Sequence, residues 1–295
     1  MMKKPLIKKK QLSLNIMTLL FLAAIFGCSA KDNPTASEEN NFVYPLKIGN
    51  KWEYMRELSV FNFRPDTVGF APSDTIISSV STVEIVRTAT LPAPVKTYVL
   101  YETLTEEGSS ASESESFYSN QADGFYYYAY RCAGSVLPKS SVKKRIYFKG
   151  RYFSHIREIT SFIEDAVSNN CVGLDSIIYE VPPLKSLPYP LEIGAQWLYR
   201  SEGNPFKIEK KVVAKDSVTV PAGHFNCYKI QWLFDIDNNG EVDRDIEFFD
   251  DICSEGLIRR NILFKDLLLT GESGPEPIGK FDVEDHSQLI NIHLN

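Results

Sequence analysis

The chain has 295 residues, a formal net charge of −6 at pH 7 and a hydrophobic fraction of 43%. A mildly acidic chain of mixed charge lacks the clustered basic face that nucleic-acid binding normally needs, so we expect no nucleic-acid partner. The length suits about two domains, and the composition is that of a folded protein.

The first residues have the pattern of an export signal. Lysines within residues 3–10 precede an apolar run over residues 12–26, which is too short for a comfortable bilayer span. The run ends in Ile25-Phe26-Gly27-Cys28, which resembles the lipobox of bacterial lipoproteins, although Phe26 stands where a small residue is usual. The resemblance implies that residues 1–27 are a signal peptide and that Cys28 carries a lipid that tethers the chain to a membrane.

A polar segment follows the signal. Residues 28–41 cannot bury a core, and we predict that they form a flexible tether. Ser29 is not the aspartate that retains many such lipoproteins at the inner membrane, so the outer membrane is favoured, with the chain facing the periplasm or the surface. A plain secretory signal and an uncleaved anchor are the alternatives.

The stretch that opens the folded part occurs twice. Residues 44–54 and 189–199 share the pattern Y-P-L-x-I-G-x-x-W-x-Y. The proline keeps the preceding tyrosine extended, the glycine permits a turn, and Trp and Tyr two residues apart face the same side of a strand. Each copy therefore predicts a turn that leads into the first strand of a sheet. The aromatic residues of the two copies are Tyr44, Trp52, Tyr54, Tyr189, Trp197 and Tyr199.

Weaker similarities follow each copy in the same order. Thr-Leu-Pro-Ala at residues 90–93 matches Thr-Val-Pro-Ala at residues 219–222. We interpret the series as duplication of a β domain, although chance would explain the short matches. The expected fold is mainly β, with two tandem, related antiparallel sheets at residues 42–183 and 184–295, each a curved sheet or half-barrel.

The first of these segments also contains an aromatic strand and one expected helix. Alternating residues predict strands over residues 81–86 and 97–102. The strand at residues 124–130 is crowded with aromatic side chains, as in a strand between two packed layers or in an aromatic platform for a ligand. Isoleucines at helical spacing predict a helix near residues 154–168.

In the second segment, residues 227–234 and 243–253 predict a β-hairpin. Pairing Trp232 with Phe248 puts the apolar residues on one side, whereas a shift by one residue would pair Trp232 with Glu247. A two-residue turn at the tip would impose that shift, so we expect a longer or bulged loop.

The same register places Cys227 directly opposite Cys253. Exported proteins meet an oxidising compartment, and we predict a disulfide between these residues. Cys132 and Cys171 then remain to pair within the first segment, because lipidation uses Cys28. Four reduced, buried thiols are the alternative, since four cysteines allow three pairings.

Acidic residues gather at the tip of the hairpin, where the register opposes like charges. Such pairs destabilise a sheet unless a cation offsets them. The run D-x-D-x-N-G-x-x-D is similar to the start of calcium loops of the EF-hand and dockerin kind, although Ile246 stands where a bidentate carboxylate belongs. A solvated acidic loop is the alternative. The predicted Ca²⁺ ligands are Asp235, Asp237, Asn239, Glu241, Asp243 and Asp245.

The folded part resembles bacterial envelope lipoproteins of uncharacterised function that open with Y-P-L-x-x-G-x-x-W-x-Y. A V-P-A-G-x-F turn and a later G-L-[IV]-[KR]-R strand recur in them, and here they stand at residues 220–225 and 256–260. The resemblance implies a curved antiparallel sheet, at most like the half-barrels of lipoprotein carriers, and it implies no activity.

The sequence has no G-x-S-x-G, H-E-x-x-H or C-x-x-C motif and no glycine-rich phosphate loop. We therefore expect a membrane-tethered, non-enzymatic binding or interaction module whose partner is an apolar ligand or an envelope protein. One alternative is a calcium-stabilised surface or adhesion protein. Another is a hydrolase of an envelope polymer, because acidic residues are plentiful and a glycosidase needs one pair of them.

Overall fold

The computed structural model describes residues 42–295 except for 66–74, 93–94, 107–110, 133–143, 165–176, 202–206 and 272–275. The predicted signal peptide, lipidated Cys28 and tether lie outside these residues. Residues 41–295 form one compact unit. Within the described ranges no helix has both the length and the apolar character needed to cross a membrane.

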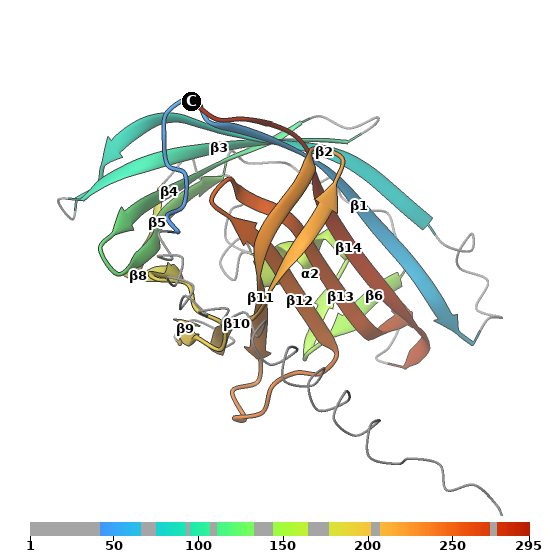
Figure 1. Ribbon diagram of the computed structural model, residues 1–295. Coiled ribbons are helices and arrows are strands. Elements are labelled where there is room, and N and C mark those ends of the chain that lie inside the picture. Colours follow the sequence, from blue (N-terminus) through green and yellow to red (C-terminus); the bar gives the residue numbers. More distant parts are fainter. Residues whose placement is uncertain are drawn as a thin grey trace, which may run out of the picture. The chain divides into compact units, whose positions relative to one another are not determined.

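The fold is mainly antiparallel β, as the sequence predicts (Figure 1). In the first half of the chain the strands are β1 (Lys51–Arg64), β2 (Thr75–Thr90), β3 (Lys96–Glu106), β4 (Ser112–Gln121), β5 (Gly124–Cys132), β6 (Lys144–Phe148), β7 (Arg151–Phe153) and β8 (Ile178–Pro188). In the second half they are β9 (Gln196–Arg200), β10 (Lys207–Val220), β11 (Gly223–Asp235), β12 (Ile246–Cys253), β13 (Gly256–Gly271) and β14 (Pro277–His293). The helix α2 (Ile156–Glu164) lies inside the predicted range 154–168.

The strands form one curled sheet in the order β8-β5-β4-β3-β2-β1-β14-β13-β12-β11-β10-β9. The first strand pairs with the last in the middle of this order, and the two end strands approach each other, so the sheet nearly closes into a barrel (Figure 1). Strands β6 and β7 lie off this path, and β6 continues the ladder on β13 at Leu268, beyond the last residue paired with β12. The end strands β8 and β9 meet through an ion pair of 2.6 Å between Glu180 and Arg200.

The two predicted domains supply the two halves of this sheet and do not form two separate sheets. The expected boundary at residues 183 and 184 falls inside β8. Strand β1 pairs with β14 from Lys51 opposite His293 to Arg64 opposite Lys280. This pairing covers an edge that each half would otherwise expose, and unpaired edges are unfavourable.

Both copies of the repeated stretch build the same turn. Gly49 and Gly194 each have a φ of +89°, a conformation that favours glycine. The Gly49 N–H donates to the carbonyl of Ile85 at 2.8 Å, and the Gly194 N–H donates to that of Val212 at the same distance. Each turn therefore ties the start of one strand to the strand that follows it. Duplication of a whole domain stays a prediction.

The predicted register of the β11–β12 hairpin is confirmed. Tyr228 lies opposite Ile252 and Trp232 opposite Phe248, with a long loop at the tip. The ladder stops earlier than predicted, because the Asp243 N–H donates to the carbonyl of Phe234 at 2.8 Å. The aspartates near the tip therefore lie in a loop and are not opposed across two strands.

Helix α2 packs inside the curled sheet. Its residues Ile159, Phe162 and Ile163 are fully buried and share one apolar cluster with side chains of β1, β11, β12 and β13. The backbone N–H of Ser154 donates to the Glu158 carboxylate at 2.7 Å, which ties the segment before the helix to its first turn. The helix therefore fills part of the interior with an apolar plug.

Replacing Gly256 tests the close packing at the start of β13. Gly256 has a φ of +114°, and a Cβ there would lie 2.8 Å from Nε1 of the buried Trp52. We expect G256A to lower the free energy of unfolding by about 2–3 kcal/mol, since backbone strain and a steric clash combine. Urea denaturation measures the loss.

The matched control is G240A. Gly240 has a φ of +88°, but nothing lies within 4 Å of a Cβ placed there, so strain alone should cost about 1 kcal/mol. Equal losses in the two variants would contradict the proposed clash with Trp52.

Candidate functional site

A cavity of about 280 Å³ lies inside the curled sheet. Strands of both halves line it, including the end strands β8 and β9 through Ser186 and Tyr199. Its volume is close to the lower limit of about 300 Å³ for small-molecule sites. Aromatic rings and charged groups share the walls, a combination typical of sites that orient a small organic molecule.

One wall is a continuous row of aromatic rings. The ring centres of Tyr44 and Phe125 are 4.2 Å apart, and those of Phe125 and Tyr118 are 4.7 Å apart. Tyr127 and then Tyr130 extend the row at 5.0 and 6.4 Å. The aromatic strand at residues 124–130 thus contributes to a cavity wall, which fits the ligand-platform alternative that the sequence left open.

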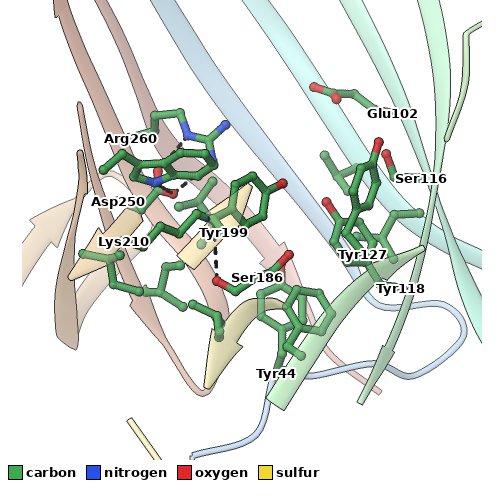
Figure 2. A pocket seen from close by; sticks show the side chains of 18 of the residues that line it. Tyr44, Glu102, Ser116, Tyr118, Tyr127, Ser186, Tyr199, Lys210, Asp250 and Arg260 are labelled. Atoms are coloured by element: carbon green, nitrogen blue, oxygen red, sulfur yellow. Dashed lines mark hydrogen bonds and ion pairs between the residues drawn. The ribbon is translucent and has the colours of Figure 1, made fainter. Parts of the chain in front are cut away.

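The opposite wall carries a buried carboxylate with its partners (Figure 2). Asp250 is 3% exposed and accepts hydrogen bonds from Nε1 of Trp232 at 2.9 Å and from Nε of Arg260 at 2.7 Å. A second contact of 3.1 Å joins Nη2 of Arg260 to the same carboxylate. Such charge-assisted, bidentate pairing offsets the cost of burying Asp250.

Lys210 lies beside this pair, between two aromatic faces. Its Nζ is 3.5 Å from the ring centre of Trp232 and 3.9 Å from that of Tyr199. It also donates to the carbonyl of Ser186 at 3.5 Å (Figure 2). Burial lowers the pKa of Lys210 well below its usual value; the Asp250 carboxylate raises it and the Arg260 guanidinium lowers it further.

The remaining charges around the cavity are also partnered. Nε of Arg56 donates to Asp285 at 2.8 Å, and the hydroxyl of Ser81 donates to Glu102 at 2.5 Å. With the Glu180–Arg200 pair, these contacts place most interior charges in local, compensated groups.

The repeated aromatic residues divide between the cavity and its surroundings. Tyr44, Tyr54 and Tyr199 line it. The buried Trp52 donates from its indole to the Glu255 carbonyl at 2.6 Å, and the half-buried Trp197 donates to that of Lys185 at 2.9 Å.

The two copies also meet directly. The Tyr44 N–H donates to the hydroxyl of Tyr189 at 2.8 Å, and that hydroxyl donates to Oδ1 of Asn120 at 2.7 Å. Burial raises the pKa of Tyr189 to about 12. The first tyrosines of the two copies are therefore joined next to the cavity.

The predicted calcium ligands lie in the loop between β11 and β12, where other groups partner them. Asp235 accepts the backbone N–H of Asn239 at 2.8 Å and that of Gly240 at 2.9 Å. Lys149, from the turn between β6 and β7, contacts Asp243 at 2.6 Å and Asp245 at 2.8 Å.

Lys149 thus supplies positive charge beside Asp243 and Asp245, where the sequence predicted a calcium ion. The amide of Asn239 donates to Asp237 at 2.9 Å, and Glu241 is exposed. In the part of the chain that the structure describes, no three His, Cys, Asp or Glu side chains are grouped so as to hold a metal ion.

Cys227 and Cys253 are buried free thiols, so the predicted disulfide is not formed in the structure. The two thiols are hydrogen-bonded to each other, and this contact, followed by burial, raises the pKa of Cys253. Both belong to an apolar cluster with Trp52, where reduced thiols pack as small apolar groups. Cys171 and the side chain of Cys132 lie outside the described residues.

Sequence reasoning missed the three charged residues at the centre of one wall, which are Lys210, Asp250 and Arg260. The alternation of inward and outward residues along each strand could have identified them. Each occupies an inward position, flanked two residues away on both sides by buried apolar residues. The flanking residues are Ile208 and Val212, Phe248 and Ile252, and Ile258 and Ile262.

Comparison with known proteins leaves the activity open. No protein-family model matches the chain, and a search of curated proteins found no significant match. Among solved structures, a Bacteroides fragilis protein described as a "putative exported protein with YmcC-like fold" aligns with 85% of this chain and 99% of its own, at 13% identity and a TM-score of 0.34.

A "putative lipoprotein" from Parabacteroides distasonis aligns with 85% of this chain and 98% of its own, at 11% identity and a TM-score of 0.34. Both TM-scores are too low for either likeness to assign a ligand or an activity to this chain.

Replacing Lys210 tests the cost of burying its amine. We expect K210M to raise the free energy of unfolding at pH 7 by about 1–3 kcal/mol, because methionine fills the site without a charge to desolvate. The unfolded lysine titrates near 10.5 and the folded one lower, so between these pKa values the unfolded state binds more protons. Wild-type stability should therefore rise relative to K210M as pH increases toward 10.5.

Urea denaturation of wild type and K210M at pH 7 and near pH 10 measures how the difference between their free energies of unfolding decreases with pH. Lys229 serves as the control, because it lies on the outer face of β11, half-buried, with its Nζ 4.6 Å from the ring centre of Phe249. K229M removes a half-buried lysine from the outer face and should not raise the free energy of unfolding at pH 7 as K210M does. If wild type and K210M differed by the same free energy of unfolding at both pH values, burial would not lower the pKa of Lys210.

Replacing Lys149 tests the loop between β11 and β12. The Asp243 side chain is 9% exposed, so K149M would leave a largely buried carboxylate without its cation. We expect a loss of about 1–3 kcal/mol in the free energy of unfolding. The control K207M breaks the Lys207–Glu209 pair, whose side chains are 41% and 28% exposed, and should change stability by less than about 1 kcal/mol. Similar losses in both variants would refute a structural role for Lys149.

Proposed function

We propose that this protein is a lipid-tethered lipoprotein of the bacterial cell envelope, held at the outer membrane through Cys28, and that it binds a small, largely aromatic or apolar molecule without transforming it. The tether is supported by the basic, apolar and Gly-Cys sequence at residues 3–28. The binding function is supported by the cavity inside the curled sheet.

The row of rings is the observation that carries the binding proposal. Tyr44, Phe125 and Tyr118 stack with interplanar angles of 10° and 13°, so they present a flat apolar edge along the cavity. Flat rings offer large contact area at little conformational cost, because each has only two rotatable side-chain bonds. The face of a planar ligand would pack edge-to-face against these ring edges.

The seam between β8 and β9, which lacks a strand ladder, gives the cavity a route for ligand exchange. Glu180 and Ser186 of β8 and Tyr199 and Arg200 of β9 all line the cavity. Side-chain contacts join these strands where a full ladder of backbone hydrogen bonds joins their neighbours. Side chains rearrange faster than a strand ladder opens, so a ligand would pass here most easily.

The state of the cavity carboxylates favours binding over hydrolysis. A two-carboxylate glycosidase needs one group free to donate a proton and one free to attack or activate water. Asp250 and Glu180 are instead held by Arg260 and Arg200 in ion pairs of 2.7 and 2.6 Å. Glu102 is left with Ser81 as its hydrogen-bond donor, and a single carboxylate does not supply both roles.

Binding of N-phenyl-1-naphthylamine, an uncharged aromatic probe, tests this function. The mature chain from Ser29, without lipid, avoids the detergent into which the probe would partition. We expect saturable fluorescence enhancement at one site in the micromolar range, because the cavity encloses the probe's rings. Absence of saturable binding would overturn the proposal.

A pair of tryptophan substitutions locates the binding. Ser116 lines the cavity, so S116W should fill it and weaken probe binding at least about tenfold. Ser78 is exposed on the outer side of β2, so S78W should bind as the wild type does. Unchanged binding in S116W would place the probe outside the cavity.

A further inference from the structure

One cation in the cavity stands apart from the others. Arg56, Arg200, Arg260 and Lys210 line it, and each arginine has a carboxylate partner. Lys210 has no carboxylate within ion-pair distance among the described residues, and its hydrogen bond is the 3.5 Å contact with a backbone carbonyl. An ammonium has three donors, so most of its hydrogen-bonding capacity is unused.

The position of this amine is buried and fixed. Lys210 is 4% exposed and lies between the faces of Trp232 and Tyr199. The two rings restrict its side chain laterally and leave the amine facing the cavity (Figure 2). Buried polar groups without partners are rare, and an unpaired one in a cavity wall is a favourable contact for a ligand.

A second donor near the seam supports the same conclusion. Nε of Arg200 is buried and has no hydrogen-bond partner among the described residues. Arg200 follows Tyr199, whose ring covers Lys210, and both line the cavity. The wall formed by β9 and β10 therefore contains buried N–H groups in excess of acceptors.

We propose that the ligand carries a single carboxylate, which binds Nζ of Lys210 while its aromatic or apolar body packs against the ring edges of Tyr44, Phe125 and Tyr118; this rests on the proposed binding function. A carboxylate supplies the acceptors that Lys210 lacks. It also compensates a charge that is costly to bury alone.

The neighbouring charges limit the ligand to one negative charge. Asp250 acts electrostatically on Lys210, and Glu102 lies across the cavity (Figure 2). A dianion such as a phosphate monoester would face repulsion from both carboxylates, with one lysine to offset it. A monoanionic carboxylate matches the single uncompensated cation.

At a pH above the lowered pKa of Lys210 in the free protein, binding should also take up a proton. Burial lowers the pKa of Lys210, and a carboxylate placed against Nζ favours the protonated amine. The charged or titratable groups that face Lys210 are Asp250 on β12, Arg260 on β13 and Tyr199 on β9. Because binding requires the protonated amine, affinity for the carboxylate should fall as pH rises.

Calorimetry with 2-naphthoate and its uncharged analogue 2-naphthamide tests the inference. For the wild-type mature chain we expect naphthoate to bind about tenfold or more tighter than naphthamide, since a hydrogen bond to a charged group adds to the shared ring contacts. K210M should remove this preference and keep naphthamide binding. K229M, which removes the lysine on the outer face, should preserve it.

Proton uptake distinguishes a carboxylate that binds Nζ of Lys210 directly from one that is attracted only by the overall charge of the cavity. At a pH above the pKa of Lys210 in the free protein, titrations of naphthoate in phosphate and in Tris buffer should give different enthalpies for the wild type, and equal enthalpies for K210M. Equal affinities of naphthoate and naphthamide for the wild type would overturn the role of Lys210 and leave the binding function standing. Failure of both compounds and of N-phenyl-1-naphthylamine to bind would overturn the binding function itself.

Discussion

The pairing of the first strand with the last is the constraint on which the rest of the structure depends. Strand β1 lies between β2 and β14, so the two halves of the chain share one continuous sheet. Such a sheet curls and encloses an interior, with a single seam at its ends. Inward-facing residues of the two halves then meet in the interior, and polar groups among them require partners there.

The interior has two regions, which differ in how many polar groups they contain. Around α2 it is apolar, and Phe162, Phe248 and Phe264 are fully buried in one cluster. Around the cavity it contains charged residues whose partners come from neighbouring strands, as Asp250 of β12 and Arg260 of β13 illustrate. The plug of α2 leaves the second region unfilled, so a space remains that is bounded by stacked rings and by the amine of Lys210, which has no carboxylate partner in the described part of the chain. The proposed ligand site is thus a consequence of incomplete filling by the chain's own side chains.

Much of the local structure was predictable because it depends on short-range patterns. The alternation around Trp232 and Phe248 set the hairpin register, since only one register buries both rings. The glycine of each repeated stretch predicted a turn, and both turns have the same hydrogen bonds. The charges of the hairpin loop were visible as well, but their partner Lys149 lies about a hundred residues earlier in the chain, and periodicity carries no information about such a distance.

The candidate site was predictable only in part. Its aromatic strand was recognised, with the choice between a packed layer and a ligand wall left open. The inward-facing charged residues, Lys210 among them, stand where the alternation of each strand calls for an apolar residue, so the sequence does contain a signal for them. Which of them have partners depends on the order of strands round the sheet, because ion pairs form between neighbouring strands.

By itself the sequence determined a mainly antiparallel β protein, the two turns and the register of one hairpin, because each follows from contacts between residues close along the chain. Only the tertiary structure decided that the two halves share one sheet, that Cys227 and Cys253 are free thiols, and that Lys210 lies in a cavity without a carboxylate partner among the described residues. These features depend on which distant strands become neighbours. That choice is made by the burial of edges and faces over the whole fold, which no local pattern records.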